Sequence, residues 1–243
     1  MKIPKNHPRY NSLMEREKIE EGFEKGIVAP TGMIAHGRGE TFDYLLGEKT
    51  PKEAIGQIEA AGAELLLAKK PVISVNGNTT ALCAREIVQL SKTVPAPIEV
   101  NLFYRTSKRI KLIEKEFAKL GVKILGTKPT TRIPKLMSQR RFVDVLGISV
   151  ADVILVMLED GDRAEFLRRM GKQVIAIDLN PLSRTARKAN ITIVDNVTRA
   201  LPLLTQKIKK LKKKKDKELR QIVSRFNNKK SLMLIEAKMR GGI

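Results

Sequence analysis

The stretch ADVILVMLEDGDRAEFLRRMGKQVIAIDL (residues 151–179) decides the fold class. It begins and ends with apolar runs of strand length, and the polar turn EDGD (159–162) opens a helical segment that Gly171 ends. Continuous apolar runs are typical of strands that are buried on both faces, as in parallel sheets. Two such strands joined by a helix predict a parallel βαβ unit with a right-handed crossover.

The same alternation continues on both sides of this unit. Further strands are predicted where short apolar runs recur, at PVISV (71–75), PIEVNLF (97–103), VKILG (122–126) and ITIVD (191–195). Residues 80–91 and the amphipathic stretch 107–121, which Gly121 closes, are predicted helices. We therefore expect an α/β protein with a Rossmann-like open, mainly parallel sheet and helices on both faces.

The first 70 residues lie outside the alternation. Ser12–Glu15 and Thr50–Glu53 have the capping-box pattern and predict helices that run to about Lys25 and Ala68. Between them, TGMIAHGRGETFDYLLGEKT (31–50) mixes four glycines with apolar residues and shows no periodicity. We expect one domain, which consists of an N-terminal helical and loop segment (1–70), a Rossmann-like core (71–205) and a basic helical C-terminal extension (206–243).

The charge balance predicts anionic partners. The 243 residues contain 47 Lys and Arg against 26 Asp and Glu, a net charge of +21. Nucleic acid, an acidic membrane surface and phosphorylated small molecules all fit such a surplus. The run KIKKLKKKKDKELR (207–220) supplies a third of it, and the rest is spread through periodic sequence, so charge alone does not choose among these partners.

Several classes of site are excluded by residue counts. The single cysteine, Cys83, excludes an internal disulfide and a cysteine-based zinc site, and we expect it to be a buried structural thiol. Two histidines are too few for a histidine-rich metal site, so no metal site is predicted. No apolar run approaches the roughly 20 residues of a membrane helix, and the N-terminus has no signal core. A soluble, cytoplasmic protein is expected.

Polar loops follow two of the predicted strands, where open parallel sheets bind ligands. Asn76-Gly77-Asn78-Thr79 comes directly after residues 71–75 and offers amide groups, a close backbone approach and a cap for the next helix. An ordinary strand-to-helix turn explains these residues equally well.

The second loop runs from Asp178 to Thr185. Asp178 can accept ribose hydroxyls, Ser183 can start a helix whose N–H groups face an anion, and Arg184 suits phosphate. A helix cap with a surface arginine is the plainer interpretation, but the coincidence of three anion-binding features favours function. Asp195-Asn196-Val197-Thr198 repeats the pattern more weakly.

The third candidate is His36-Gly37-Arg38-Gly39-Glu40. Glycine weakens helices and strands alike, so an arginine between two glycines indicates a loop whose backbone comes close to a ligand. The flanking Met33, Ile34, Phe42 and Tyr44 indicate an ordered segment. No G-x-G-x-x-G follows a strand and no P-loop is present, so any ATP phosphates must be held by scattered arginines and helix ends.

Three blocks carry a family resemblance: HPRYNSLMEREKIEEGFEKGI (7–27), TGMIAHGRGETFDYLLGEKT (31–50) and PVISVNGNTTAL (71–82). They closely resemble archaeal phosphopantothenate synthetases, and DLNPLSRTA (178–186) and IVDNVTRALP (193–202) fit the same family. The resemblance spans about residues 2–205, with mild departures at Met33 and Thr41. The basic C-terminal segment carries no motif that matches.

The resemblance implies a homodimeric ligase that condenses 4-phosphopantoate with β-alanine through an acyl adenylate, using ATP and Mg²⁺ carried by the nucleotide. By motif, ATP contacts fall to nine residues: Arg16, Arg38, Asp178, Leu179, Asn180, Arg184, Thr185, Asn196 and Val197. From position and chemistry, Asn76, Asn78, Thr79 and His36 are the candidates for the substrate pocket, with Arg38 and His36 as catalytic residues and His36 as a base for the β-alanine amine.

Two alternatives remain open on the sequence. A basic nucleic-acid-binding protein is favoured by the lysine run, although no helix-turn-helix, zinc-finger or aromatic stacking pattern is present, so only non-specific binding is expected. Another nucleotide-dependent enzyme on the same type of sheet, such as a methyltransferase or dehydrogenase, is weakened by the missing glycine fingerprint.

Overall fold

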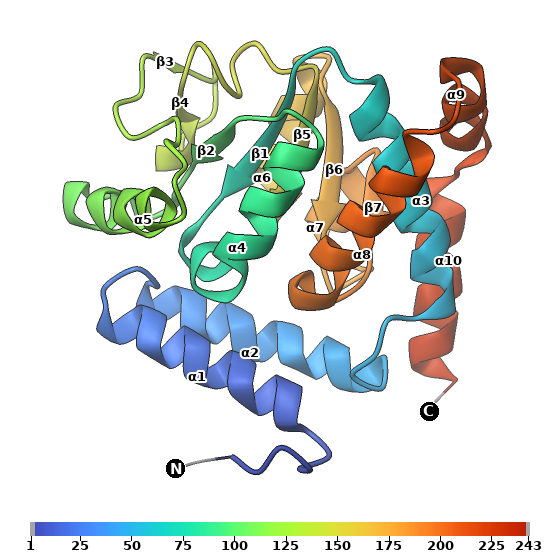
Figure 1. The fold of residues 1–243 in the computed structure, drawn as a ribbon, viewed down its shortest axis with the longest axis horizontal. Helices are drawn as coiled ribbons and strands as arrows, with labels where there is room; N and C mark the ends of the chain where they lie inside the picture. Colours follow the sequence, from blue (N-terminus) through green and yellow to red (C-terminus); the bar gives the residue numbers. More distant parts are fainter. Residues whose placement is uncertain (1–2, 242–243) are drawn as a thin grey trace.

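Five parallel strands form the centre of the molecule, which the computed structural model describes over residues 3–241 (Figure 1). The strand order is β2-β1-β5-β6-β7. The strands are β1 (Pro71–Val75), β2 (Ile98–Val100), β5 (Val153–Met157), β6 (Gln173–Ile177) and β7 (Ile191–Ile193). The Rossmann-like open parallel sheet predicted from the sequence is confirmed.

The order of the strands reverses next to β1. In register, Ile73 of β1 pairs with Ile98 of β2 on one side and with Leu155 of β5 on the other. The chain therefore leaves β1 toward one edge of the sheet and returns on the opposite side. At such a reversal the loops after the two neighbouring strands diverge, and the crevice between them is where open α/β sheets bind ligands.

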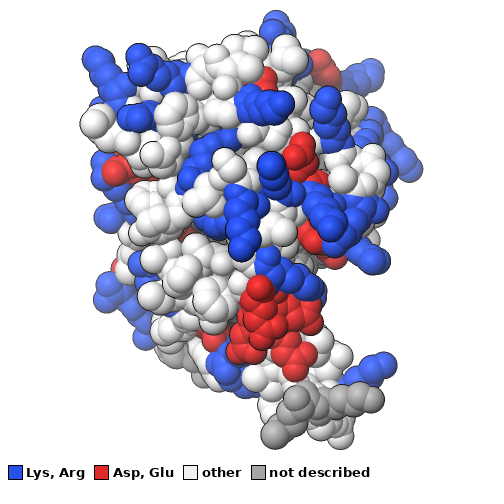
Figure 2. Space-filling model, turned by 90° about the vertical axis from the view of Figure 1, so that its left-hand side faces the viewer, with Lys and Arg blue, Asp and Glu red and all other residues white. Residues whose placement is uncertain are grey.

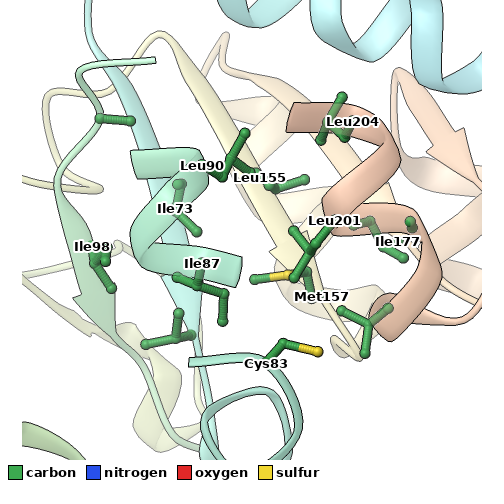
Figure 3. Packing of buried hydrophobic residues seen from close by; sticks show 14 of the residues in the cluster. Ile73, Cys83, Ile87, Leu90, Ile98, Leu155, Met157, Ile177, Leu201 and Leu204 are labelled. Carbon is green, nitrogen blue, oxygen red and sulfur yellow. The ribbon is translucent and has the colours of Figure 1, made fainter. Parts of the chain in front are cut away.

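Helices cover both faces because alternate strand residues point to opposite sides. One face packs against α3 (Lys52–Leu67), α4 (Gly77–Thr93) and α8 (Val197–Leu211). Figure 3 shows this core, in which side chains of three strands meet those of α4 and α8: Ile73, Leu155, Ile177, Cys83, Ile87, Leu90, Leu201 and Leu204. Cys83 is buried, as predicted, and burial raises the pKa of its thiol.

The opposite face is covered more irregularly. It packs against α6 (Gly161–Arg169) and the segment 127–150, which contains β3 (Thr131–Arg132), the short 3-10 helix η1 (Gln139–Arg141) and β4 (Phe142–Val143). Glu99, from the middle of β2, is buried on this side. Its two carboxylate oxygens accept hydrogen bonds from the N–H groups of Asp144 (2.9 Å) and Ile148 (2.6 Å). One buried side chain thereby fixes the irregular segment to the sheet.

The remaining helices lie around this core. They are α1 (Tyr10–Glu24), α2 (Pro30–Leu45), α5 (Ser107–Lys119), α7 (Arg184–Lys188), α9 (Asp216–Arg225) and α10 (Asn228–Arg240). Helices α1 and α2 form a hairpin across the end of the sheet that carries the carboxyl termini of the strands (Figure 1). We call this pair the roof.

The prediction of a strand at VKILG (122–126) is wrong. Only Leu125 pairs with the sheet, through a single bridge to Glu99. Gly126 adopts a left-handed conformation (φ 78°) directly after it, so the chain turns away before a ladder can form.

Both predicted capping boxes are also wrong. Helix α1 begins two residues before Ser12, whose hydroxyl instead donates to Glu40 of α2 (2.9 Å). Thr50 does not cap α3, because its hydroxyl donates to Asp195 (2.7 Å) at the end of β7. In both places a tertiary hydrogen bond replaces the local one.

The glycine-rich stretch around His36 is not a loop, as its glycines suggested, but the middle of helix α2. Gly32 has a packing reason: a Cβ there would lie 2.4 Å from Oδ1 of Asn78, so only glycine lets α2 approach α4 this closely. The intrinsic cost of glycine in a helix is about 1 kcal/mol per residue, which tertiary packing can outweigh.

The basic C-terminal run is packed rather than free. Ile208, Leu211 and Leu219 are buried, while the lysines around them face outward, and Lys214 pairs with Glu218.

Basic side chains are also spread over the face that carries α5. Figure 2 shows Lys and Arg on this face separated by uncharged residues, and it shows acidic side chains gathered near α1 and α2, at the bottom of the view. Within residues 3–241, no helix has the length and apolarity of a bilayer span.

Candidate functional site

A cavity of about 280 Å³ opens where the strand order reverses, between the roof and the ends of β1, β2 and β5. We call it the switch-point cavity. Its walls combine glycine, asparagine and arginine with a few apolar side chains: Ala29, Thr31, Gly32, Ala35, His36, Arg38, Asn76, Gly77, Asn78, Leu102, Phe103, Tyr104, Arg109, Arg140, Leu158 and Asp160. Four of the predicted site residues, His36, Arg38, Asn76 and Asn78, line it together.

Asn76 organises the floor of the cavity. It caps α4, its side-chain oxygen accepting from the N–H of Thr79 (3.1 Å), while its amide nitrogen donates to the carbonyls of Met157 (2.9 Å) and Leu158 (3.2 Å). Leu158 has a positive φ of 51°, unusual for a residue with a branched side chain. Residues 76–79 are therefore the N-cap and first turn of α4, and not the separate strand-to-helix turn that the sequence allowed.

Thr79 and Asn78 have different roles in this wall. The Thr79 hydroxyl accepts from the N–H of Asn76 (2.9 Å), and its side chain is fully buried, so it completes the cap and does not line the cavity. Asn78 lines the cavity, and its amide nitrogen donates to the carbonyl of Gly32 in α2 (2.8 Å). This bond ties the roof to α4.

Helix α2 brings His36 and Arg38 to the opposite wall. Burial lowers the pKa of His36 below its usual 6.5, despite the nearby carboxylates of Glu40 and Asp43. The imidazole is therefore mostly neutral at pH 7 and able to accept a proton. Arg38 is exposed to solvent and close enough to Asp178 to act on it electrostatically.

The loop after β6 is held by its own hydrogen bonds. The Asp178 carboxylate accepts from the N–H of Asn180 (2.9 Å) and from the hydroxyl of Ser183 (2.5 Å), and burial raises its pKa. The Ser183 oxygen also caps α7, as predicted, by accepting from the N–H of Ala186. Leu179 is buried below the roof, 3.6 Å from the position that a Cβ on Gly39 would take.

Arg184 and Thr185 connect the loop after β6 to the segment that follows β5. The Arg184 guanidinium is paired with Asp162 and with Glu165 (2.7 Å) on α6. The Thr185 hydroxyl donates to the carbonyl of Glu159 (2.6 Å), which follows β5. Any phosphate at this position would compete with two carboxylates for Arg184.

Asn196 and Val197 lie at the start of α8, beside a second cavity of about 330 Å³ that Glu15, Asp43, Thr198 and Arg199 help to line. We call it the α8 cavity. The amide nitrogen of Asn196 donates to Glu15 (2.8 Å) and Asp43 (3.0 Å). Burial raises the pKa of Glu15, and Arg199 pairs with Asp43.

Arg16 lies on the roof between these regions. It pairs with Glu40 (2.8 Å), one turn from His36 on α2. Arg16, Arg38 and Arg184 thus come from three separate elements to the same end of the sheet. Arg16 and Arg184 are paired with carboxylates there, whereas Arg38 faces solvent.

Three charged lining residues escaped the sequence analysis: Arg109, Arg140 and Asp160. Arg109 belongs to an ordinary amphipathic helix, and Arg140 to the irregular segment 127–150. Asp160 stands in a loop whose composition is that of any turn. Periodicity gave no reason to select them, because only the folded chain brings them to the cavity.

The fold and the cavity define an open α/β protein whose candidate ligand site, at the reversal of the strand order, is rimmed by arginines and amide groups suited to anionic small molecules. The model of the family described as phosphopantothenate/pantothenate synthetase matches residues 53–241. This chain belongs to that family.

Curated relatives agree over nearly the whole chain. A 4-phosphopantoate–β-alanine ligase of Thermococcus onnurineus is 54% identical over 96% of this chain and 90% of its own length. Proteins of the same name from Thermococcus kodakarensis (54% identical; 95% and 89%) and Methanosarcina mazei (49% identical; 95% and 91%) are similar over comparable lengths. The family match reaches residue 241, so it includes the C-terminal helices, in which the sequence showed no matching motif.

Proposed function

We propose that this chain is a cytoplasmic ATP-dependent ligase that joins 4-phosphopantoate to β-alanine and gives 4'-phosphopantothenate, AMP and pyrophosphate, as a step of coenzyme A synthesis. Family membership and the names of the relatives support the reaction. The observation that carries it in the structure is the cavity at the reversal of the strand order, with arginines from α2, α5 and segment 127–150 in its walls.

In the first step, a carboxylate oxygen of phosphopantoate attacks the α-phosphorus of ATP, and the bond from this phosphorus to the pyrophosphate oxygen breaks. The products are an acyl adenylate and pyrophosphate. No base is needed, since the carboxylate is already ionised. Both substrates are polyanions, and fixed guanidinium charges offset their repulsion. Arg16, Arg38 and Arg184 are assigned this task because arginine stays protonated at any physiological pH.

In the second step, the amine of β-alanine attacks the acyl carbon, and the bond to the AMP oxygen breaks. The nitrogen then loses a proton, which we assign to the neutral imidazole of His36. Asn76 and Asn78 are assigned to the phosphopantoate side of the cavity. Thr79, which is buried, is assigned only to the support of Asn76.

The nucleotide is assigned to the loops after β6 and β7. Asp178, Leu179, Asn180 and Thr185 belong to the first loop, and Asn196 and Val197 begin α8, whose first N–H groups favour anions. Mg²⁺ held by the triphosphate would neutralise part of its charge. Residues 3–241 contain no cluster of three or more His, Cys, Asp or Glu with the geometry of a metal site.

The test is direct. Purified protein is incubated with ATP, Mg²⁺, β-alanine and 4-phosphopantoate, and the products are separated. AMP and pyrophosphate in equal amounts are expected. ADP would indicate phosphate transfer instead, and an absence of turnover would overturn the proposal.

We further propose that the chain works as a homodimer, as the family resemblance implies. Large apolar side chains of segment 127–150 are exposed, with Met137 at 83% and Leu146 at 73%, and burial in a subunit contact would explain them. Light scattering during gel filtration should give twice the mass of the chain. A monomer at micromolar concentration would contradict this.

A further inference from the structure

The switch-point cavity contains three guanidinium groups whose surroundings differ. They belong to Arg38, Arg109 and Arg140. Arg38 is exposed, so water solvates its charge. The other two are partly or wholly withdrawn from water, and a buried charge is expensive unless an opposite charge lies beside it.

Arg140 already has its counter-charges. Its guanidinium pairs with Glu159 (2.9 Å) and Asp160 (2.7 Å). Glu159 also pairs with the fully buried Arg163. Two arginines and two carboxylates therefore form a balanced group, which needs no further anion.

Among residues 3–241, no carboxylate pairs with Arg109. Its guanidinium donates only to backbone carbonyls there: that of Ile27, from Nε (3.2 Å) and Nη2 (2.9 Å), and that of Tyr104, from Nη1. Desolvation, and then the nearby charge of Arg140, lowers the pKa of Arg109. A half-buried cation that faces a cavity and has no carboxylate partner of its own is typical of a site for an anionic ligand.

The amino end of α4 adds to the positive potential at the same place. A Cβ on Gly77 would lie 2.8 Å from Nη2 of Arg109 and 2.3 Å from the carbonyl oxygen of Ile27. Only glycine therefore lets the guanidinium lie against the first turn of this 17-residue helix. The N–H of Thr79 is capped by the side chain of Asn76, whereas those of Gly77 and Asn78, which line the cavity, have no intrahelical partner. Arg109 and these N–H groups thus share one wall of the cavity.

We propose that Arg109, together with the start of α4, binds the 4-phosphate of phosphopantoate. This inference rests on the proposed function. The phosphate lies at the α4 end of the switch-point cavity, and the reacting carboxylate points toward Arg38 and the loop after β6, where the nucleotide is assigned. The carboxylate of β-alanine has similar chemistry, so the test must separate these two anions.

The central variant is Arg109→Gln, which keeps a donor for the Ile27 carbonyl and removes the charge. Pyrophosphate exchange into ATP in the absence of β-alanine reports the first step alone. With 4-phosphopantoate, kcat/KM should fall on the order of 100-fold, as expected when a charge-assisted contact is lost. With unphosphorylated pantoate it should change less than 3-fold, so that the preference for the phosphorylated substrate disappears. The KM for β-alanine in the complete reaction should stay the same.

Two further variants complete the design. Arg109→Lys keeps a positive charge and should restore most of the preference for phosphopantoate, whereas loss of folding would affect both substrates and the thermal unfolding curve. Lys111→Ala removes an exposed charge from the same helix and should behave as wild type. An unchanged preference in Arg109→Gln, or an effect confined to the KM for β-alanine, would overturn the inference. Failure of the wild type to form AMP would reject the proposed function instead, and phosphopantoate binding by calorimetry would still test the site.

Discussion

The side-chain amide of Asn76, at the end of β1, donates a 2.9 Å hydrogen bond to the carbonyl oxygen of Met157, at the end of β5. The two residues are 81 positions apart in the sequence. They lie at the ends of the two strands between which the strand order reverses, so this bond joins the two sides of the crevice in which the candidate ligand site lies. Since the same side chain also caps α4, one residue fixes a helix and a loop together.

Asn76→Asp tests this role. The aspartate keeps the oxygen that caps α4, but it presents a second acceptor to the carbonyls of Met157 and Leu158. We expect the free energy of unfolding to fall by about 2 kcal/mol, since buried acceptors lose their donor. Denaturant unfolding measures this. Asn227 caps α10 in the same way and is exposed, so Asn227→Asp serves as the matched control and should be neutral. Equal stability of the two variants would argue against the role of Asn76.

Arg38→Ala and Arg184→Ala should each lower kcat/KM for ATP about 30-fold, as expected for the loss of one charge-assisted hydrogen bond to a phosphate in the transition state. Initial rates of pyrophosphate release measure the effect. Arg187 is exposed on the same short helix as Arg184, and Arg187→Ala should retain wild-type kinetics. Wild-type kinetics in the first two variants would remove them from the nucleotide site.

His36→Gln should slow amide formation at least 100-fold at neutral pH, as is usual when a general base is lost, and leave pyrophosphate exchange intact. Burial lowers the pKa of His36 below its usual 6.5, so the imidazole stays neutral to more acid pH than an ordinary histidine and becomes protonated as the pH falls further. In the wild type, the rate of amide formation should therefore fall toward acid pH. This decrease should be absent in the variant. His7→Gln, which changes the other histidine, is the control. Full turnover of His36→Gln across neutral pH would exclude the base.

Glu99 should make the stability of the protein depend on pH. Burial raises the pKa of its carboxyl from 4.5 to about 7. Between these values the folded state binds a proton that the unfolded state has lost, so stability is highest at acid pH and is lost as the pH rises to 7. The resulting loss in the free energy of unfolding is on the order of 3 kcal/mol. Denaturant unfolding at pH 5 and pH 8 measures this. The free energy of unfolding should change less between the two pH values in Glu99→Gln than in the wild type. The control Glu20→Gln, at an exposed position, should show the same change as the wild type. The same pH dependence of stability in Glu99→Gln and wild type would contradict this role of Glu99.

Local patterns in the sequence predicted the five strands of the sheet, although they failed at residues 122–126 and at both capping boxes. Apolar runs, such as that at 153–157, and helix ends at Gly121 and Gly171 predicted the sheet and its crossovers, because strand burial and left-handed glycine ends are local properties. The helix that contains Gly37 and Gly39 was missed because its stability comes from packing against α1 and α4, which no short pattern reveals.

The site shows the same division. Asn76 and Arg38, which line the cavity, were selected from the sequence because they stand beside glycines. Arg109 was missed because its distinguishing feature is the lack of a nearby carboxylate. That feature exists only in three dimensions, among residues as distant as Ile27 and Arg140.

Helix α2 forms a wall of both cavities, with His36 and Arg38 at the switch-point cavity and Asp43 at the α8 cavity. Its 16 residues make a rod about 24 Å long. If the helix moves as a rigid body when one cavity fills, its other end moves too, and we expect binding in the two cavities to be coupled. Steady-state kinetics should then show that saturation with one substrate changes the apparent affinity for the other, and the order in which substrates enter becomes a property of this single rod.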